Sequence, residues 1–166
     1  MAGHTQADEL TTASARGDIR EVEMILQNGA DANERNTWNR TAIQVMKLGN
    51  PAIAEALLSA NADPNVRDPV LGLTVAHDAS RDGFLDTLKV LVFRGADINV
   101  IDNAGNLPLH LAAREGHQDV VEFLTQHTSD PSQRNGGGQT PCDLAKMHNR
   151  SSTAQWLEAY VLSNQK

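Results

Sequence analysis

The sequence predicts an all-α solenoid of five helix-turn-helix repeats joined by β-turn/hairpin loops. One leucine in each of four successive units keeps a period of 33 residues: Leu58, Leu91, Leu124 and Leu157. Hydrophobic residues make up 40% of the 166-residue chain but aromatic residues only 4%, which suits thin helical layers filled by Ala, Leu and Val. Short polar segments with Gly or Asn separate the apolar stretches, as turns between helices require.

A period of 33 residues is the spacing of ankyrin repeats. Each unit reads as a polar turn, a short Ala-rich helix, a Gly or Asn break and a second helix with an aliphatic stripe. Two helices of this length cannot bury their apolar faces alone, so neighbouring units must stack. We therefore expect one ankyrin-repeat domain over residues 1–166, with repeats at about 8–36, 37–68, 69–101, 102–134 and 135–166.

The first three repeats close their second helices with similar turns. These turns are Gly29-Ala30-Asp31, Asn61-Ala62-Asp63 and Gly95-Ala96-Asp97. Gly or Asn supplies the left-handed residue that ends a helix, and Asp or Asn then accepts hydrogen bonds from the following backbone.

The second repeat has lost one residue from its helical part. Eighteen positions lead from Gln44 to Ala62, against nineteen from His77 to Ala96 in the third repeat. The segment Gly49-Asn50-Pro51 follows its first helix directly. Glycine and proline both oppose helix formation, so we expect this first helix to be short.

The third repeat begins with a turn that is one residue longer than its neighbours. Fifteen positions lead from Ala62 to His77, against fourteen from Ala30 to Gln44, and the extra residue falls within Asp68–Gly72. Val70 and Leu71 would occupy the tip of this longer turn.

The fourth repeat follows the ankyrin pattern, and the fifth has the features of a terminal repeat. In the fourth, Pro108 starts the first helix, where its missing N–H costs nothing. In the fifth, Thr140-Pro141-Cys142 opens the first helix, and the second helix ends in a polar tail. A polar outer face is typical of a terminal repeat that caps a solenoid.

Charge and cysteine content exclude several classes of function. The formal net charge is −7, and the basic residues are scattered, so we expect no nucleic-acid partner. An acidic surface favours a partner with a basic face. The single cysteine excludes an internal disulfide and a Cys-rich zinc site. The sequence shows no signal peptide and no long apolar run, so we expect a soluble protein of cytoplasm and nucleus with no membrane partner.

No catalytic or metal-binding constellation emerges from the sequence. His77 and Asp78 are adjacent in a predicted helix and point about 100° apart, so they do not pair as base and carboxylate. His77 reads instead as a structural histidine that bonds the neighbouring turn, and His110 repeats it one period later. Cys142 takes the apolar position that Leu109 fills in the fourth repeat, which favours a buried thiol over a nucleophile.

Two other groups lack the partners that their chemistry would need. Gly136-Gly137-Gly138 lacks the Lys and the Ser or Thr that follow a phosphate-binding loop. His127 and His148 lie in different repeats without an acidic or thiolate cluster. We therefore expect no enzyme, no cofactor and no metal.

With catalysis and metal binding excluded, a protein-binding surface is the remaining function, and the irregular third repeat is where we expect it. Charged residues gather there beside the apolar turn tip: Asp68, Asp78, Arg81 and Asp86. Such a set is either an ordinary solvated face or a protein-binding hot spot, which needs an apolar tip beside fixed charges. The residues alone leave both open.

Two segments resemble the ankyrin-type inhibitors of cyclin-dependent kinases. These are Thr41–Asn50 and His77–Leu88, and the Gly-Phe-Leu-Asp-Thr-Leu run at 83–88 is not part of the general ankyrin pattern. Residues 105–113 are similar to the five-repeat members, whereas the longer turn at Asp68 is similar to the four-repeat members. The resemblance covers all five repeats.

The resemblance implies inhibition by binding. Such proteins dock beside the catalytic cleft of the G1 kinases, distort the kinase so that cyclin and ATP binding are disfavoured, and restrain G1/S progression. By motif match the contact residues are Met46, Lys47, Asp68, Asp78, Arg81 and Phe84. The expected partners are the G1 kinase catalytic subunits, bound by a monomer, and Asp78 is expected to face a basic kinase side chain.

Some positions depart from the family pattern. Ser80 stands where alanine is usual, Val75-Ala76 precedes His77 where proline or a larger aliphatic residue is common, and Trp38-Asn39 replaces an aromatic-glycine pair. The alternative function is a general ankyrin scaffold that recruits another protein, such as a transcription regulator, through the same face.

Overall fold

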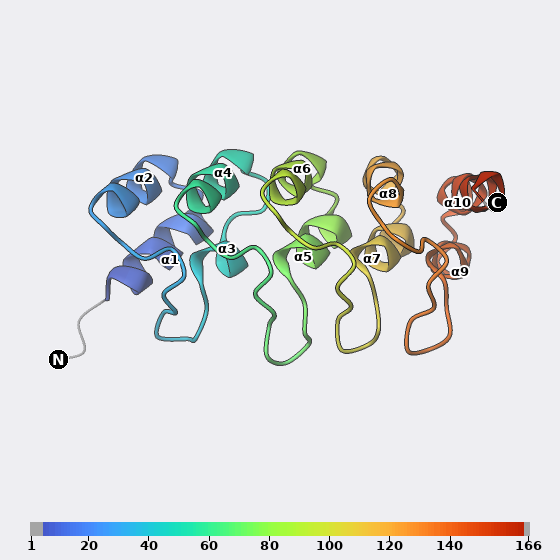
Figure 1. The fold of residues 1–166 in the computed structure, drawn as a ribbon, viewed down its shortest axis with the longest axis horizontal. Helices are drawn as coiled ribbons and strands as arrows, with labels where there is room; N and C mark the ends of the chain where they lie inside the picture. The colour runs from blue at the N-terminus through green and yellow to red at the C-terminus, as the bar shows by residue number, and fades with distance from the viewer. Residues whose placement is uncertain (1–4, 165–166) are drawn as a thin grey trace.

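The structure is a computed structural model that describes residues 5–164. The described chain contains ten helices and no strand: α1 (Gln6–Arg16), α2 (Ile19–Gln27), α3 (Ala42–Val45), α4 (Pro51–Ser59), α5 (Val75–Asp82), α6 (Leu85–Phe93), α7 (Pro108–Glu115), α8 (Gln118–Thr125), α9 (Pro141–Met147) and α10 (Ser151–Ser163). They form five antiparallel pairs in an elongated stack, which confirms the predicted all-α solenoid (Figure 1). Helix α1 begins at Gln6, two residues before the expected start of the first repeat.

The helices form two rows, with the turns projecting beyond one of them (Figure 1). The odd-numbered helices pack along the inner row, and the even-numbered helices lie along the outer row. Each projecting turn closes on itself through backbone hydrogen bonds, as from Asp68 N to Leu73 O at 2.8 Å and from Asp102 N to Asn106 O at 2.9 Å. In residues 5–164 no helix combines the length and the hydropathy needed to cross a membrane.

The missing residue in the second repeat shifts the register of its outer helix. Leu57, not Leu58, is the fully buried counterpart of Leu91. The backbone shows the same equivalence, because Ala62 N donates to Leu57 O as Ala96 N donates to Leu91 O. Leu58, which lies 33 residues before Leu91, is therefore not its structural equivalent. It occupies the next position along α4 and is only slightly less buried than Leu57.

The first helix of the second repeat is short, as the sequence predicts. Helix α3 is four residues long and ends at Val45. Asn50 then caps α4, its side chain accepting from Ala52 N at 3.1 Å, and Pro51 takes the first helical position. The segment between the two helices is held by a backbone bond from Lys47 N to Ser14 O at 2.9 Å.

Amide hydrogen exchange should be faster in the second repeat than in the third and fourth. Helix α3 has few internal hydrogen bonds, whereas α5 and α7 are each eight residues long and pack tightly together. We expect amides of Ala42–Val45 to exchange about tenfold faster than buried amides of α5. Exchange followed by mass spectrometry checks this, and uniform protection along the stack would contradict it.

His77 and His110 connect successive repeats, as expected of structural histidines. The ring of His77 accepts from Thr74 N through Nδ1 at 3.2 Å, and its Nε2 lies 2.9 Å from Asn106 O in the next turn. His110 repeats the arrangement, with Nε2 3.1 Å from Gln139 O. Burial lowers the pKa of both imidazoles below the ordinary value.

Acidification should destabilise the stack through these two histidines. In the unfolded chain their pKa is ordinary, about 6.5, whereas burial lowers it in the folded protein. The unfolded state therefore binds more protons as the pH falls below 6.5, and the free energy of unfolding decreases. Urea denaturation at pH 7.5 and pH 5.5 tests this, and an equal or higher midpoint at pH 5.5 would contradict it.

Candidate protein-binding surface

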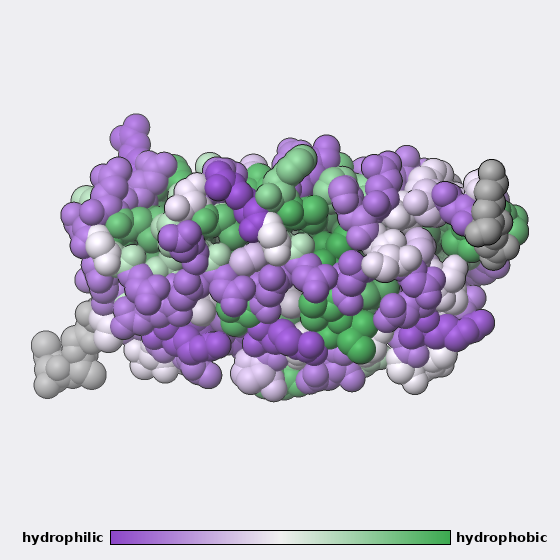
Figure 2. Space-filling view, viewed as in Figure 1, coloured by the Kyte–Doolittle hydropathy of each residue, from purple (hydrophilic) through white to green (hydrophobic). Residues whose placement is uncertain are grey.

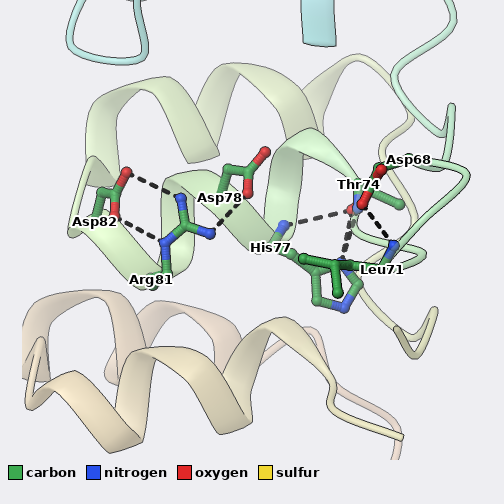
Figure 3. Close-up of polar contacts among 7 residues, drawn as sticks. All are labelled: Asp68, Leu71, Thr74, His77, Asp78, Arg81 and Asp82. Carbon is green, nitrogen blue, oxygen red and sulfur yellow. Dashed lines mark hydrogen bonds and ion pairs between the residues drawn. The ribbon is translucent and has the colours of Figure 1, made fainter. Parts of the chain in front are cut away.

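The longer turn of the third repeat is held from inside by Asp68. Its carboxylate accepts from Leu71 N at 2.8 Å (Figure 3) and also from Val70 N at 3.0 Å. Arg40, from the preceding turn, lies 3.6 Å from the same carboxylate. These interactions, the Val70 hydrogen bond first, lower the pKa of Asp68. The Asp68 side chain is only 13% exposed. Its role is therefore to hold the turn, and it offers little surface to a binding partner.

The turn carries its apolar tip into solvent. Val70 is 73% exposed and Leu71 is 57% exposed, which is unusual for aliphatic side chains held in a fixed conformation. Asn103 of the next repeat holds the tip in place, donating from Nδ2 to Val70 O and from its backbone to Leu71 O, both at 2.9 Å. The tip is therefore both exposed and preorganised.

Helix α5 places an ion cluster on its exposed side. The guanidinium of Arg81 donates to Asp78 Oδ1 at 2.9 Å and to both carboxylate oxygens of Asp82, at 3.0 and 3.2 Å (Figure 3). Partial burial raises the pKa of Asp78, although the neighbouring Arg81 acts in the opposite direction. Two carboxylates share one guanidinium, so the cluster retains an excess negative charge at neutral pH.

Two hollows flank the turn tip, and Leu71 and Leu73 line both. The first, about 390 Å³, also includes Arg40, Asp68 and Asp78, and the second, about 500 Å³, includes Arg81. We call the set that joins them the third-turn surface: the exposed Val70 and Leu71 with the half-buried Asp78 and Arg81. An apolar projection between charged hollows is suited to docking against a protein.

The remaining expected contact residues lie elsewhere. Met46 is only 4% exposed and packs in the hydrophobic core, because the chain turns inward after the short α3. This corrects the expectation that Met46 offers a surface contact. Lys47 is exposed. Phe84, 37% exposed, precedes α6 and lines a separate hollow with Gly49 and Pro51.

Three residues in or near the neighbouring turns were not predicted as contacts from the sequence. Arg40 belongs to another repeat, and only its charge hinted at the pairing with Asp68. Asn103 reads as an ordinary turn residue, yet it fixes the tip. Trp38, 72% exposed at the preceding turn, was noted only as a departure from a pattern.

The thiol of Cys142 and the glycine run at 136–138 both lie in contacts that hold the fold together. Cys142 is partly buried, its thiol lies 3.5 Å from Ala154 O, and burial raises its pKa. Gly136 belongs to a turn and donates to Ala104 O at 2.9 Å. Over the part of the chain that the structure describes, no group of three or more His, Cys, Asp or Glu side chains is arranged to hold a metal ion.

Comparison with known proteins places the chain among repeat proteins. The pattern described as "Ankyrin repeats (3 copies)" matches residues 10–102, 45–135 and 76–162. Together these overlapping matches cover nearly the whole stack.

Several relatives share the sequence more specifically. Mouse cyclin-dependent kinase 4 inhibitor B is 45% identical over 111 residues, which cover 67% of this chain and 85% of that protein. Human cyclin-dependent kinase inhibitor 2A is 48% identical over 105 residues, which cover 63% of this chain and 67% of that protein. Bovine mitochondrial disaggregase is 33% identical over 91 residues, but these cover only 13% of that protein.

Proposed function

Because this chain belongs to the ankyrin-repeat family of cyclin-dependent kinase inhibitors, we propose that its third-turn surface docks on a G1 kinase beside the catalytic cleft. Two of its relatives are named as inhibitors of cyclin-dependent kinases, which supports inhibition of such a kinase by this protein. The observation that carries the proposed site is the apolar tip, Val70 and Leu71, held rigidly between charged hollows.

The charges on the third-turn surface indicate which kinase side chains would face it. The excess negative charge around Asp78 calls for a basic side chain, and Arg81 can pair with an acidic one. Lys47 and Phe84 lie apart from the third-turn surface and would form a second contact with the kinase, while Asp68 acts indirectly by holding the turn.

Inhibition then follows from rigidity rather than from catalysis. The projecting turns and the inner helices form one stacked body, so a docked molecule acts as a wedge between the kinase lobes. The distorted kinase disfavours cyclin and ATP binding, which restrains G1/S progression. We place this activity in the cytoplasm and nucleus.

Replacing the exposed tip residue should weaken inhibition. Leu71→Ala removes much of an apolar side chain that would become buried on docking, which we expect to raise the inhibitory concentration about tenfold. The measurement is phosphorylation of retinoblastoma protein by a purified G1 kinase. Met147→Ala, at an equally exposed site on α9, is the matched control.

The assay also separates inhibition from a general scaffold function. A protein that recruits some other partner through the same face would leave the phosphorylation unchanged at all concentrations. If Leu71→Ala and Met147→Ala inhibit equally well, the third-turn surface is not the docking site.

A further inference from the structure

The outer row of helices carries a groove far from the third-turn surface. It lies between α2 and α4, has a volume of about 650 Å³, and is lined by Glu23, Leu26, Gln27, Ala52, Glu55, Ala56, Ser59 and Ala60. Apolar surface shows between hydrophilic rims in this row, whereas the turns project on the opposite side (Figures 1 and 2).

Small side chains on α4 create the groove. By the register given above, Ala56 and Ala60 correspond to Val90 and Arg94 of α6. Arg94 spans the next interhelical gap and contacts Glu55 and Ser59. The gap between α2 and α4 has no such filler, so its apolar floor stays open.

The same row also carries an exposed aromatic side chain. Phe93, at the end of α6, is 84% exposed. It follows Leu91 by two positions, as Ser59 follows Leu57, and Ser59 lines the groove. Repeat symmetry therefore places Phe93 and the groove on the same face of the solenoid.

The charges beside these two features are complementary. Lys89 lies one turn before Phe93 on α6 and is exposed, and Glu23 stands at the rim of the groove. Within residues 5–164 neither side chain takes part in an ion pair. An apolar group with a lysine beside it thus matches a groove with a free carboxylate at its edge.

We propose that the outer face is a self-association surface, on which Phe93 of one molecule enters the α2–α4 groove of a second copy and Lys89 pairs with Glu23. Because both features lie on one face, a twofold axis satisfies each of them twice and closes the assembly as a dimer. The net charge of −7 opposes association, so the dissociation constant should be on the order of 10⁻⁴ M. The sequence predicts a monomer, whereas this proposal gives a dimer at high protein concentration.

Sedimentation equilibrium between about 10 μM and 1 mM tests the dimer. The average mass should rise above the monomer mass of 17.9 kDa toward twice that value. Phe93→Ser should raise the dissociation constant at least about tenfold, because the groove loses its occupant in both halves. Leu162→Ser, at another exposed apolar position, is the matched control and should leave it unchanged.

A charge exchange tests the predicted pair. Glu23→Lys and Lys89→Glu should each weaken the dimer about tenfold, since the twofold axis repeats each repulsion, and the double variant should recover most of the affinity. A constant monomer mass up to 1 mM, equal effects of Phe93→Ser and Leu162→Ser, or no recovery in the double variant would overturn the proposal. Kinase inhibition by Phe93→Ser should stay unchanged, so this test is independent of the proposed kinase site.

Discussion

Replacing Asp78 by alanine should weaken binding to a G1 cyclin-dependent kinase by about 2–5 kcal/mol. Asp78 is a half-buried residue of α5, 2.9 Å from Arg81, and lines the hollow beside the turn tip. A basic kinase side chain docked there would lose its partner in a desolvated interface. Isothermal titration calorimetry with the purified kinase measures the loss.

Asp82→Ala is the matched control for Asp78→Ala. Asp82 also binds Arg81, but it is more exposed and does not line either hollow. Its removal should cost less than about 1 kcal/mol. Circular dichroism should show unchanged helicity in both variants. Equal affinities of the wild-type protein and Asp78→Ala would mean that this carboxylate does not face the kinase.

The repeat architecture was accessible from the sequence because stacking repeats one set of burial requirements at each unit. The short α3 was also predictable, since Gly49 and Pro51 act locally on the backbone. The residue of the second repeat that is equivalent to Leu91 was harder to predict from the sequence. One missing residue moved the buried position from Leu58 to Leu57, and spacing alone cannot say on which side of a deletion the register changes.

The candidate binding surface was only partly predictable, because exposure depends on contacts between repeats. Met46 follows a truncated helix, and its side chain turns into the core where the sequence pattern gave no sign of it. The pairing of Asp68 with Arg40 joins two turns 28 positions apart, and Asn103 fixes a tip in another repeat. Asp78 and Arg81 were predicted because a family motif and the irregular third repeat both single out this segment, and the structure pairs them on α5.

His77→Ala should lower the free energy of unfolding by about 3–5 kcal/mol. The imidazole is fully buried, so its loss leaves a cavity between α5 and the following turn. It also leaves Thr74 N and Asn106 O without the ring that bonds them. Because the turn that includes Asn106 lies next to the tip at Val70 and Leu71, kinase affinity should fall together with stability. Urea denaturation gives the first quantity.

Ser80→Ala distinguishes this specific loss from a general sensitivity of α5 to truncation. Ser80 is as fully buried as His77 and lies in the same helix, but its hydroxyl has no hydrogen-bond partner within the described residues. Removing an unpaired buried hydroxyl should leave stability unchanged or raise it slightly, by about 1 kcal/mol. If both variants lose stability equally, packing alone maintains the third repeat, and the histidine bonds contribute nothing measurable to the rigid turn of the proposed docking site.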